Sequence, residues 1–456
     1  LSIKLKNKEL TPDALVETIY ARIEKYEGKI NSFVTLRPKM DVLKDLADLP
    51  TSDSPLWGIP YVMKDAYCTI GIKTTAASNV LKNFTPTYSA TVYQKLKAAG
   101  AILIGKMNQD AWGHGGSTEN TDFGPVHNPW DLKRVAGGSS GGPAAALAAG
   151  FAVFAIGEDT GGSIRNPAGW TNTTGLKVTY GRVSRYGAIA YASSFDTMGP
   201  MGRNVEDCAY VLQTIAGVDP YDATSSPLPV DDYVTHLNDE VRGKVIGIPQ
   251  ELYGDGLDPE IKANIMEAVK EYQKLGVKIV DVSLPIAKIG LAAYYLIAPS
   301  ETSSNLARYD GVRFGEGRDE FTPETMRRIM IGTYALSAGY YDAYYKKAQK
   351  VRTLMITAYD QALSSCDAMI MPIMPTHPTL IGEIVSDPIK NLLADIYTTS
   401  INPVGVPSLA LPAGFSKSGL PIGMQLVGKK FAEGLLLNLG YKYQLVTDWH
   451  TKEPTL

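Results

Sequence analysis

Two clusters of glycine and serine near the middle of the chain have residue types suited to nucleophilic chemistry. The first covers residues 137–142 and contains Ser139, and the second covers residues 159–165 and contains Ser163. Glycine allows backbone torsions that other residues avoid and lets a substrate approach the main chain closely. The two clusters therefore predict a serine nucleophile in a loop that binds its substrate against the backbone.

The second cluster also offers hydrogen-bond donors for an oxyanion. Successive backbone N–H groups in a glycine-rich loop can point inward and stabilise the negative charge of a tetrahedral intermediate. The donors that we expect here are the N–H groups of Thr160, Gly161, Gly162 and Ser163. Either cluster by itself is more typical of a tight structural turn.

Lys64 is the candidate base for the serine, because it ends the apolar run of residues 61–64. A lysine loses its proton near neutral pH only where it is removed from water. Ser–Lys catalysis is a known variant of the serine triad. The alternative interpretation is a surface lysine held in a salt bridge. The combination of both clusters with an upstream lysine favours catalysis.

Two further motifs resemble known functional sites, a phosphate-binding loop and a nucleophile elbow, but each lacks a feature that its site requires. Residues 100–107 match most of a phosphate-binding loop, but they lack the Ser or Thr that holds magnesium, and their apolar centre predicts a buried strand that ends in a turn. Residues 137–141 match the G-x-S-x-G elbow, which needs a preceding strand and a later histidine. Residues 129–136 are charged and predict irregular structure. The later histidines lie in segments without catalytic character: His236, His377 and His450.

Alternating helices and strands must hold these clusters. Helices are expected at 11–26, 89–99, 144–149, 205–216 and 259–275, and strands at 58–64, 101–104, 151–156, 244–248 and 277–282. One helix and one strand fit between the clusters, which would bring both loops to one end of a sheet. We predict an α/β fold with a mixed central sheet covered by helices on both faces, in a single domain over residues 1–456 with a glycine-rich catalytic centre at about 113–187.

Composition limits the possible partners. The 456 residues are 45% hydrophobic and 20% charged, and their net charge of −3 gives no general attraction to nucleic acid or to an anionic membrane. The three cysteines form neither a metal motif nor a disulfide framework. No apolar run is long enough for a membrane span. We expect no metal in this chain, and any RNA to be bound mainly by another subunit.

The two clusters, followed by Gly175-Leu-Lys177, resemble the amidase signature family. Ser139 lies 24 residues before Ser163, which is the spacing of that family. The resemblance implies a Ser–cis-Ser–Lys triad. In it Ser163 attacks the amide carbonyl, and Ser139, after a cis peptide bond, passes the proton to Lys64 and later returns it to the leaving amine.

Further motifs resemble one branch of this family, the A subunits of glutamyl-tRNA(Gln) amidotransferases. They lie at residues 118–120, 180–187 and 339–345, and the similarity runs from about residue 4 to residue 443. The resemblance implies a glutaminase that passes ammonia to a B subunit. That partner would bind tRNA and use ATP and magnesium to convert Glu-tRNA(Gln) to Gln-tRNA(Gln). A small third subunit would complete the heterotrimer, and this chain would need no cofactor itself.

The resemblance also assigns two residues to glutamine binding. Arg328 should hold the carboxylate of the free amino acid, and Asp395 should hold its ammonium. A guanidinium fork suits the first group and a carboxylate suits the second. In isolation each residue would be read as an ordinary surface charge.

Other features leave alternatives open. Pro143, the Trp112-Gly-His114 segment and residues 169–172 depart from the usual pattern of the branch, which indicates a divergent member and favours a mitochondrial matrix location over a bacterial cytoplasm. A stand-alone amidase acting on another small or fatty amide would share the triad but would not need Arg328 or Asp395. A non-catalytic scaffold subunit would need neither the triad nor that pair.

Overall fold

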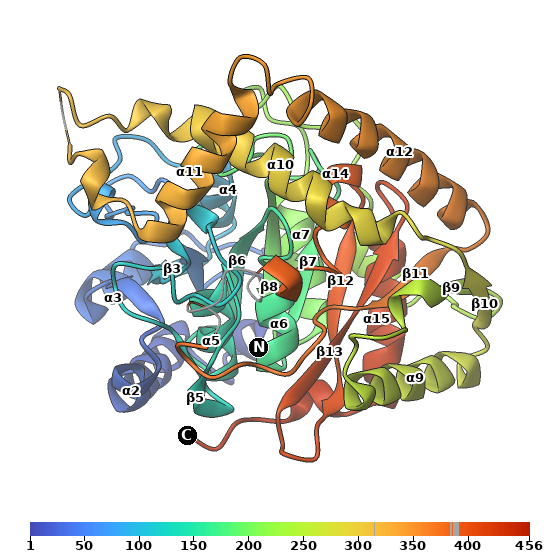
Figure 1. Cartoon of the computed structure of the whole chain (residues 1–456). Helices are drawn as coiled ribbons and strands as arrows, with labels where there is room; N and C mark the ends of the chain where they lie inside the picture. Colours follow the sequence, from blue (N-terminus) through green and yellow to red (C-terminus); the bar gives the residue numbers. More distant parts are fainter. Residues whose placement is uncertain (314, 384, 386–391) are drawn as a thin grey trace.

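A mixed sheet of 11 strands forms the centre of the molecule (Figure 1). The computed structural model describes residues 1–313, 315–383, 385 and 392–456. The strand order is β1-β3-β2-β6-β8-β7-β12-β13-β11-β9-β10, with both parallel and antiparallel neighbours. The bounds are β1 (Phe33–Leu36), β2 (Pro60–Lys64), β3 (Ile102–Met107), β6 (Phe154–Asp159), β7 (Thr174–Lys177), β8 (Thr197–Gly202), β9 (Val245–Pro249), β10 (Lys278–Val282), β11 (Ala368–Pro372), β12 (Ser408–Phe415) and β13 (Pro421–Gly428).

Helices cover both faces of this sheet. They are α1 (Ser2–Lys6), α2 (Pro12–Ile30), α3 (Lys39–Ala47), α4 (Thr91–Ala98), α5 (Gly141–Ala148), α6 (Arg165–Thr171), α7 (Val205–Ile215), α8 (Tyr233–His236), α9 (Pro259–Lys274), α10 (Ala287–Asn305), α11 (Pro323–Leu336), α12 (Tyr345–Ser364), α14 (Ile401–Val404) and α15 (Glu433–Val446). The predicted α/β class, with helices on both faces of a mixed sheet, is confirmed.

Two cores lie on the two faces, and the pleat of the strands separates them. Alternate side chains of a strand point to opposite faces. In β2, Tyr61 and Met63 join the core beneath α4, α7 and α15, whereas Val62 joins the core beneath α2, α5 and α6. In β6, Phe154 and Ala155 divide in the same way. Because both faces are buried, the sequences of these strands are apolar at nearly every position.

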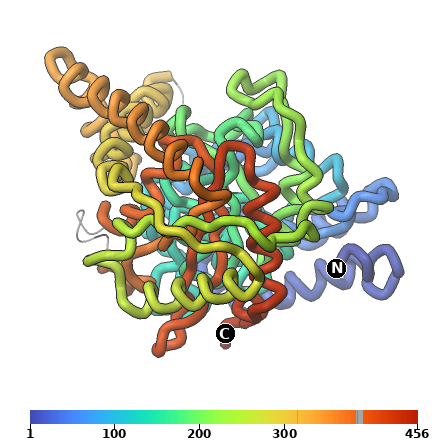
Figure 2. The backbone as a smooth tube through the Cα atoms, turned by 90° about the vertical axis from the view of Figure 1, so that its right-hand side faces the viewer, coloured from blue at the N-terminus to red at the C-terminus, as the bar shows by residue number. Residues whose placement is uncertain are grey.

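Helices α10, α11 and α12 form a further layer above the sheet (Figure 1). Helix α10 packs against both α11 and α12, and Figure 1 shows these three helices together, in yellow and orange, above the sheet. In Figure 2 they lie on the side of the molecule opposite the dark blue N-terminal segment. Tyr294 and Ile297 of α10 form a small core with Tyr191 and Phe195. Tyr294 also lies against Gly161, so this layer reaches the loop that contains Ser163.

Most predicted elements exist, but two strands near the site have different limits. The strand expected at 101–104 continues to Met107, because it pairs with β2 as far as the Lys64–Met107 register and because Asp65 neutralises the buried Lys106 at 3.3 Å. The strand expected at 151–156 begins at Phe154 and runs to Asp159, because its polar end pairs with β8. Apolar runs located both strands but did not fix their limits.

The prediction of irregular structure at residues 129–136 is wrong. Asp131–Val135 forms strand β5, which pairs with β4 (His127–Asn128) in a separate two-stranded ribbon. Short strands of this kind gain their order from neighbours that the local sequence does not reveal. No helix in the described part of the chain has both the length and the apolarity needed to cross a membrane.

Candidate active site

Lys64 and the second glycine–serine cluster meet at the ends of two adjacent parallel strands. Strands β2 and β6 pair with Tyr61 opposite Phe154 and Met63 opposite Ile156. Because parallel neighbours end at the same edge of a sheet, Lys64 emerges beside Glu158 although 94 residues separate them. Ligand sites of open α/β sheets commonly lie at this carboxyl edge.

The Lys64 ammonium group is fully buried and has three hydrogen-bond acceptors. Its Nζ lies 2.7 Å from Ser139 Oγ, 2.6 Å from Glu158 Oε2 and 3.3 Å from the Glu158 carbonyl oxygen. The expected burial of Lys64 is confirmed, and so is its proximity to Ser139. The carboxylate beside the lysine is an addition that the sequence analysis did not predict.

The first cluster forms the loop between β5 and α5, and it places Ser139 against Lys64. The peptide bond between Gly138 and Ser139 is cis, as the family resemblance implies. A side chain at Gly138 would collide with the Asp110 carboxylate, so this position needs glycine. The Ser140 N–H donates to the Ser163 carbonyl at 3.0 Å. The two clusters are therefore in direct contact, as predicted.

The second cluster forms the loop between β6 and α6 and is anchored by a buried ion pair. The Arg165 guanidinium lies 3.0 Å from Asp159, and Asp159 in turn accepts the N–H groups of Gly162 and Ile164. Burial alone would raise the pKa of Asp159, but Arg165 outweighs it and holds the pKa below its usual range. Ser163 keeps 7% exposure, whereas Ser139 is fully buried. Ser163 is thus the serine that faces outward.

The expected oxyanion donors are not equivalent. The Gly162 N–H is occupied by Asp159 at 2.9 Å, so the prediction fails for Gly162 in this geometry. Within the described residues, the N–H groups of Thr160, Gly161 and Ser163 have no hydrogen-bond partner and are free for a substrate oxygen. Gly162 has φ +133°, and a side chain there would collide with Thr398. Its glycine is needed to shape the loop.

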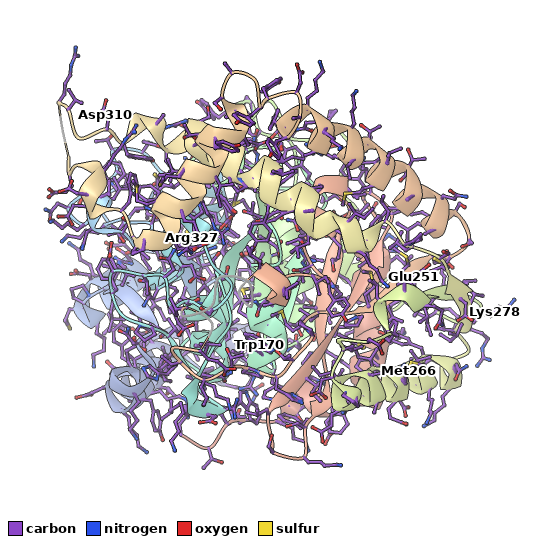
Figure 3. All side chains as sticks on the ribbon, in the orientation of Figure 1. Trp170, Glu251, Met266, Lys278, Asp310 and Arg327 are labelled. Atoms are coloured by element: carbon purple, nitrogen blue, oxygen red, sulfur yellow. The ribbon has the colours of Figure 1, made fainter. Side chains whose placement is uncertain are left out.

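Arg328 points inward from α11 toward the loops. Its side chain is 4% exposed, whereas that of the preceding Arg327, labelled in Figure 3, is 45% exposed. Arg328 Nη1 donates to the Tyr191 hydroxyl at 2.6 Å and Nε donates to Glu324 at 2.9 Å. The guanidinium also lies over the ring of Tyr295, 5.4 Å from its centre. Arg328 is therefore a buried cation and not an ordinary surface charge.

Asp395 lies close to Arg328 through a bridge of tyrosines. The Tyr295 hydroxyl donates to Asp395 Oδ2 at 2.8 Å. Thr398, three residues after Asp395, contacts the nucleophile loop (residues 159–165), because its Oγ1 donates to the Gly161 carbonyl at 2.6 Å. Burial raises the pKa of Asp395 to about 6, although Tyr295 and Arg328 oppose this. Tyr295 thus links Arg328 to Asp395, and the binding of glutamine by these two residues stays a prediction.

Sequence reasoning missed several residues of the site. Glu158 could have been noticed, because it directly precedes Asp159 in the second cluster, but Tyr191, Tyr294, Tyr295 and Asp196 carried no local signal. In the described part of the chain, none of the five histidines has a hydrogen bond to either serine. Buried His114 contacts Thr302 and Thr325 instead, both at 3.2 Å.

Comparisons with known proteins agree with this geometry. The Amidase family model matches residues 14–437. The glutamyl-tRNA(Gln) amidotransferase A subunit of Marinomonas sp. (strain MWYL1) is 47% identical over 475 residues, covering 100% of this chain and 98% of the relative. The protein of the same name from Geobacter metallireducens is 48% identical over 469 residues, with coverage of 99% and 97%. The crystal structure of the corresponding protein from Thermotoga maritima matches with a TM-score of 0.82 at 39% identity, over 94% of this chain and 90% of that one.

Proposed function

This chain belongs to the Amidase family, and from this premise we propose that it is the glutamine-hydrolysing subunit of a glutamyl-tRNA(Gln) amidotransferase. One observation favours glutamine as the substrate. A buried guanidinium, Arg328, and a carboxylate, Asp395, both contact Tyr295, the first over its ring and the second at its hydroxyl. A free amino acid offers the matching carboxylate and ammonium, whereas a hydrophobic amide offers neither.

The proposed reaction begins at Ser163. Its Oγ attacks the side-chain amide carbon of glutamine while its proton passes to Ser139, and the proton of Ser139 passes to Lys64. The Gly161 and Ser163 N–H groups receive the developing oxyanion. Lys64 returns the proton through Ser139 to the leaving nitrogen, the C–N bond breaks, and ammonia departs. A γ-glutamyl ester on Ser163 remains, and water cleaves it with the same relay.

The partners are part of the same proposal. A B subunit binds tRNA and uses ATP and magnesium to activate the glutamate of Glu-tRNA(Gln), and a small third subunit completes a heterotrimer. The names of the relatives support the tRNA-dependent amidotransferase. The mitochondrial matrix stays a prediction from the departures of this sequence, and the relatives named above come from bacteria, which keeps the bacterial cytoplasm as its alternative.

Covalent trapping tests the function. The purified chain, with any partners that co-purify, is incubated with a diazoketone analogue of glutamine, and the adduct is located by peptide mass mapping. We expect an adduct on Ser163 that free glutamine suppresses, and no adduct or glutamine turnover in Ser163→Ala. Ser140→Ala is the matched control within the neighbouring loop, and it should still be labelled at Ser163.

The competing functions give different results in the same experiment. A stand-alone amidase for another amide would be labelled at Ser163 by a general sulfonyl fluoride but not by the glutamine analogue. A scaffold subunit would be labelled by neither reagent. Full turnover in Ser163→Ala would refute the nucleophile assignment.

A further inference from the structure

The hydrogen bonds around Lys64 join it to one serine and one glutamate. Lys64 Nζ has three partners, the Ser139 hydroxyl and two oxygens of Glu158. A hydroxyl can accept a hydrogen bond from an ammonium or donate one to an amine, so the contact between Lys64 and Ser139 suits a proton transfer between them. The carbonyl and carboxyl oxygens of Glu158 accept the other N–H groups of Lys64.

The far side of Glu158 is also occupied, by a hydroxyl that lies between two carboxyl groups. Thr160 Oγ1 contacts Glu158 Oε1 and lies 2.7 Å from Asp196 Oδ1, and all three side chains are buried. A hydroxyl has a single hydrogen, so it can donate to one carboxyl and must accept from the other. One of these two carboxyl groups must therefore carry a proton.

Asp196 is the carboxyl that carries it. Burial, together with the nearby Glu158 charge, raises the pKa of Asp196 to about 8. A protonated Asp196 donates to Thr160, and Thr160 donates to Glu158, whose other carboxyl oxygen contacts Lys64. Backbone N–H groups of Tyr191 and Ala192 fix the Asp196 carboxyl at 3.0 and 2.9 Å.

We propose that Glu158 is a positioning residue that makes Lys64 and Glu158 a single base, in which the carboxylate orients the lysine and stabilises the ammonium formed when Ser139 gives up its proton. This inference rests on the proposed function of Lys64 and Ser139. Without Glu158, each proton transfer would create an isolated ammonium in a buried site, which is costly. With Glu158, the charge created on Lys64 meets a carboxylate 2.6 Å away.

Asp110 and Tyr67 also lie close to this pair. Asp110, whose pKa burial raises to about 7, lies on the Ser139 side of Lys64, and its two oxygens accept the N–H groups of Thr118 and Asn120. Tyr67, from the turn after β2, lies near Glu158 and donates to the Gly157 carbonyl at 2.5 Å. Burial raises the pKa of Tyr67 well above its usual value, so it stays neutral in the range of the test.

The test is the pH dependence of kcat at saturating glutamine in Glu158→Gln, measured as ammonia release by the chain with its co-purifying partners. Saturation removes the titration of Asp395 from the profile, because kcat reports groups of the bound complex. Loss of an adjacent opposite charge should move the midpoint of the acid limb about one to three pH units lower. The plateau should fall about tenfold or more, because the weakened base transfers protons less well. KM should change little.

Two further variants separate charge from folding. Glu158→Asp keeps the carboxylate and should hold the midpoint near that of the parent chain. Glu158→Ser carries the same expected shift as Glu158→Gln and replaces it if the glutamine variant fails to fold. Glu433→Gln is the matched control, because Glu433 is also buried and accepts the Thr179 N–H far along the chain from Lys64. Its acid limb should be that of the parent chain.

A midpoint unchanged in folded Glu158→Gln, or moved to higher pH, would overturn the inference while leaving the glutaminase in place. Failure of the proposed function looks different, because the parent chain would then release no ammonia from glutamine. In that case the pH dependence of Ser163 modification by a sulfonyl fluoride, compared between the parent chain and Glu158→Gln, tests the same shift without glutamine.

Discussion

At the scale of single residues, the proposed specificity depends on charges that match those of a free amino acid. Arg328 donates one hydrogen bond from Nη1 to Tyr191 and another from Nε to Glu324, and together they fix the plane of the guanidinium. Its remaining amino group has no hydrogen bond in the described part of the chain and is available to a carboxylate. A lysine has a point charge and no such fork, so the substitution by lysine is not conservative at this position.

Arg328→Lys should therefore raise KM for glutamine by about ten- to a hundredfold, the equivalent of about 1.5–3 kcal/mol for a hydrogen bond to a charged group. The value of kcat should change less, because the contact exists in both the ground state and the transition state. Steady-state ammonia release measures both constants. Arg327→Lys is the control, since Arg327 points outward from the same helix. Unchanged KM in Arg328→Lys would contradict glutamine as the substrate.

Asp395 should impose a pH limit of its own on substrate capture. Its pKa is raised to about 6, so the carboxylate that attracts the glutamine ammonium is present above that pH and lost below it. We expect kcat/KM of the parent chain to fall below about pH 6. Asp395→Asn should be about ten- to a hundredfold slower above that pH, and the ratio of the two proteins should shrink as the pH falls. A constant ratio between pH 5 and pH 8 would exclude this role.

At the scale of elements, the nucleophile loop is held by an ion pair between its two ends and by the neighbouring helix that this pair contacts. Asp159, at the end of β6, binds the loop backbone, and Arg165, at the start of α6, reaches Asn402 of α14 at 2.7 Å. One ion pair thus joins a strand and two helices. Removal of one partner from a buried pair leaves an uncompensated charge, which is strongly destabilising.

Asp159→Asn should lower the free energy of unfolding by about 3–5 kcal/mol near neutral pH. The sign of its pH dependence follows from the lowered pKa of Asp159 in the folded state. The ionised group stabilises the fold above the unfolded pKa of about 4, and that contribution is lost as the pH falls further. Urea unfolding at pH 7 and at pH 3.5 should show a smaller difference between the two proteins at the lower pH. An equal difference at both would contradict the ion-pair explanation.

At the scale of the whole molecule, one sheet gathers residues that are distant in the chain, while the charge of the molecule stays close to neutral. The net charge is −3, so the surface lacks the basic excess of a nucleic-acid-binding protein. In the proposed complex the tRNA is therefore held mainly by the partner, and this chain supplies ammonia.

The isolated chain should bind tRNA(Gln) no more tightly than about 10 μM at physiological salt, the range of non-specific binding. The complex with its B subunit should bind much more tightly and with a steeper dependence on salt. Filter binding at several salt concentrations measures both. Submicromolar binding by the isolated chain would contradict the division of labour between subunits.

The sequence was sufficient where function depends on short motifs and on periodicity. Ser139, Ser163 and Lys64 lie in local patterns whose glycines and apolar flanks have a direct physical meaning. The alternation of helices and strands likewise predicted the α/β class, since burial on both faces imposes apolar runs on the strands. Element limits near the site were less accurate, because β6 extends through polar residues whose burial depends on β8.

Only the tertiary structure decided which distant side chains share the site. Glu158 reaches Lys64 because β2 and β6 are neighbours, and strand order is a property of the whole sheet that no local pattern encodes. Tyr295 reaches Asp395 across 100 residues because α10 packs over the nucleophile loop. The sequence by itself therefore determined the proposed nucleophile and its relay, whereas the packing of the sheet and of α10 determined that Glu158 meets Lys64 and that Tyr295 meets Asp395.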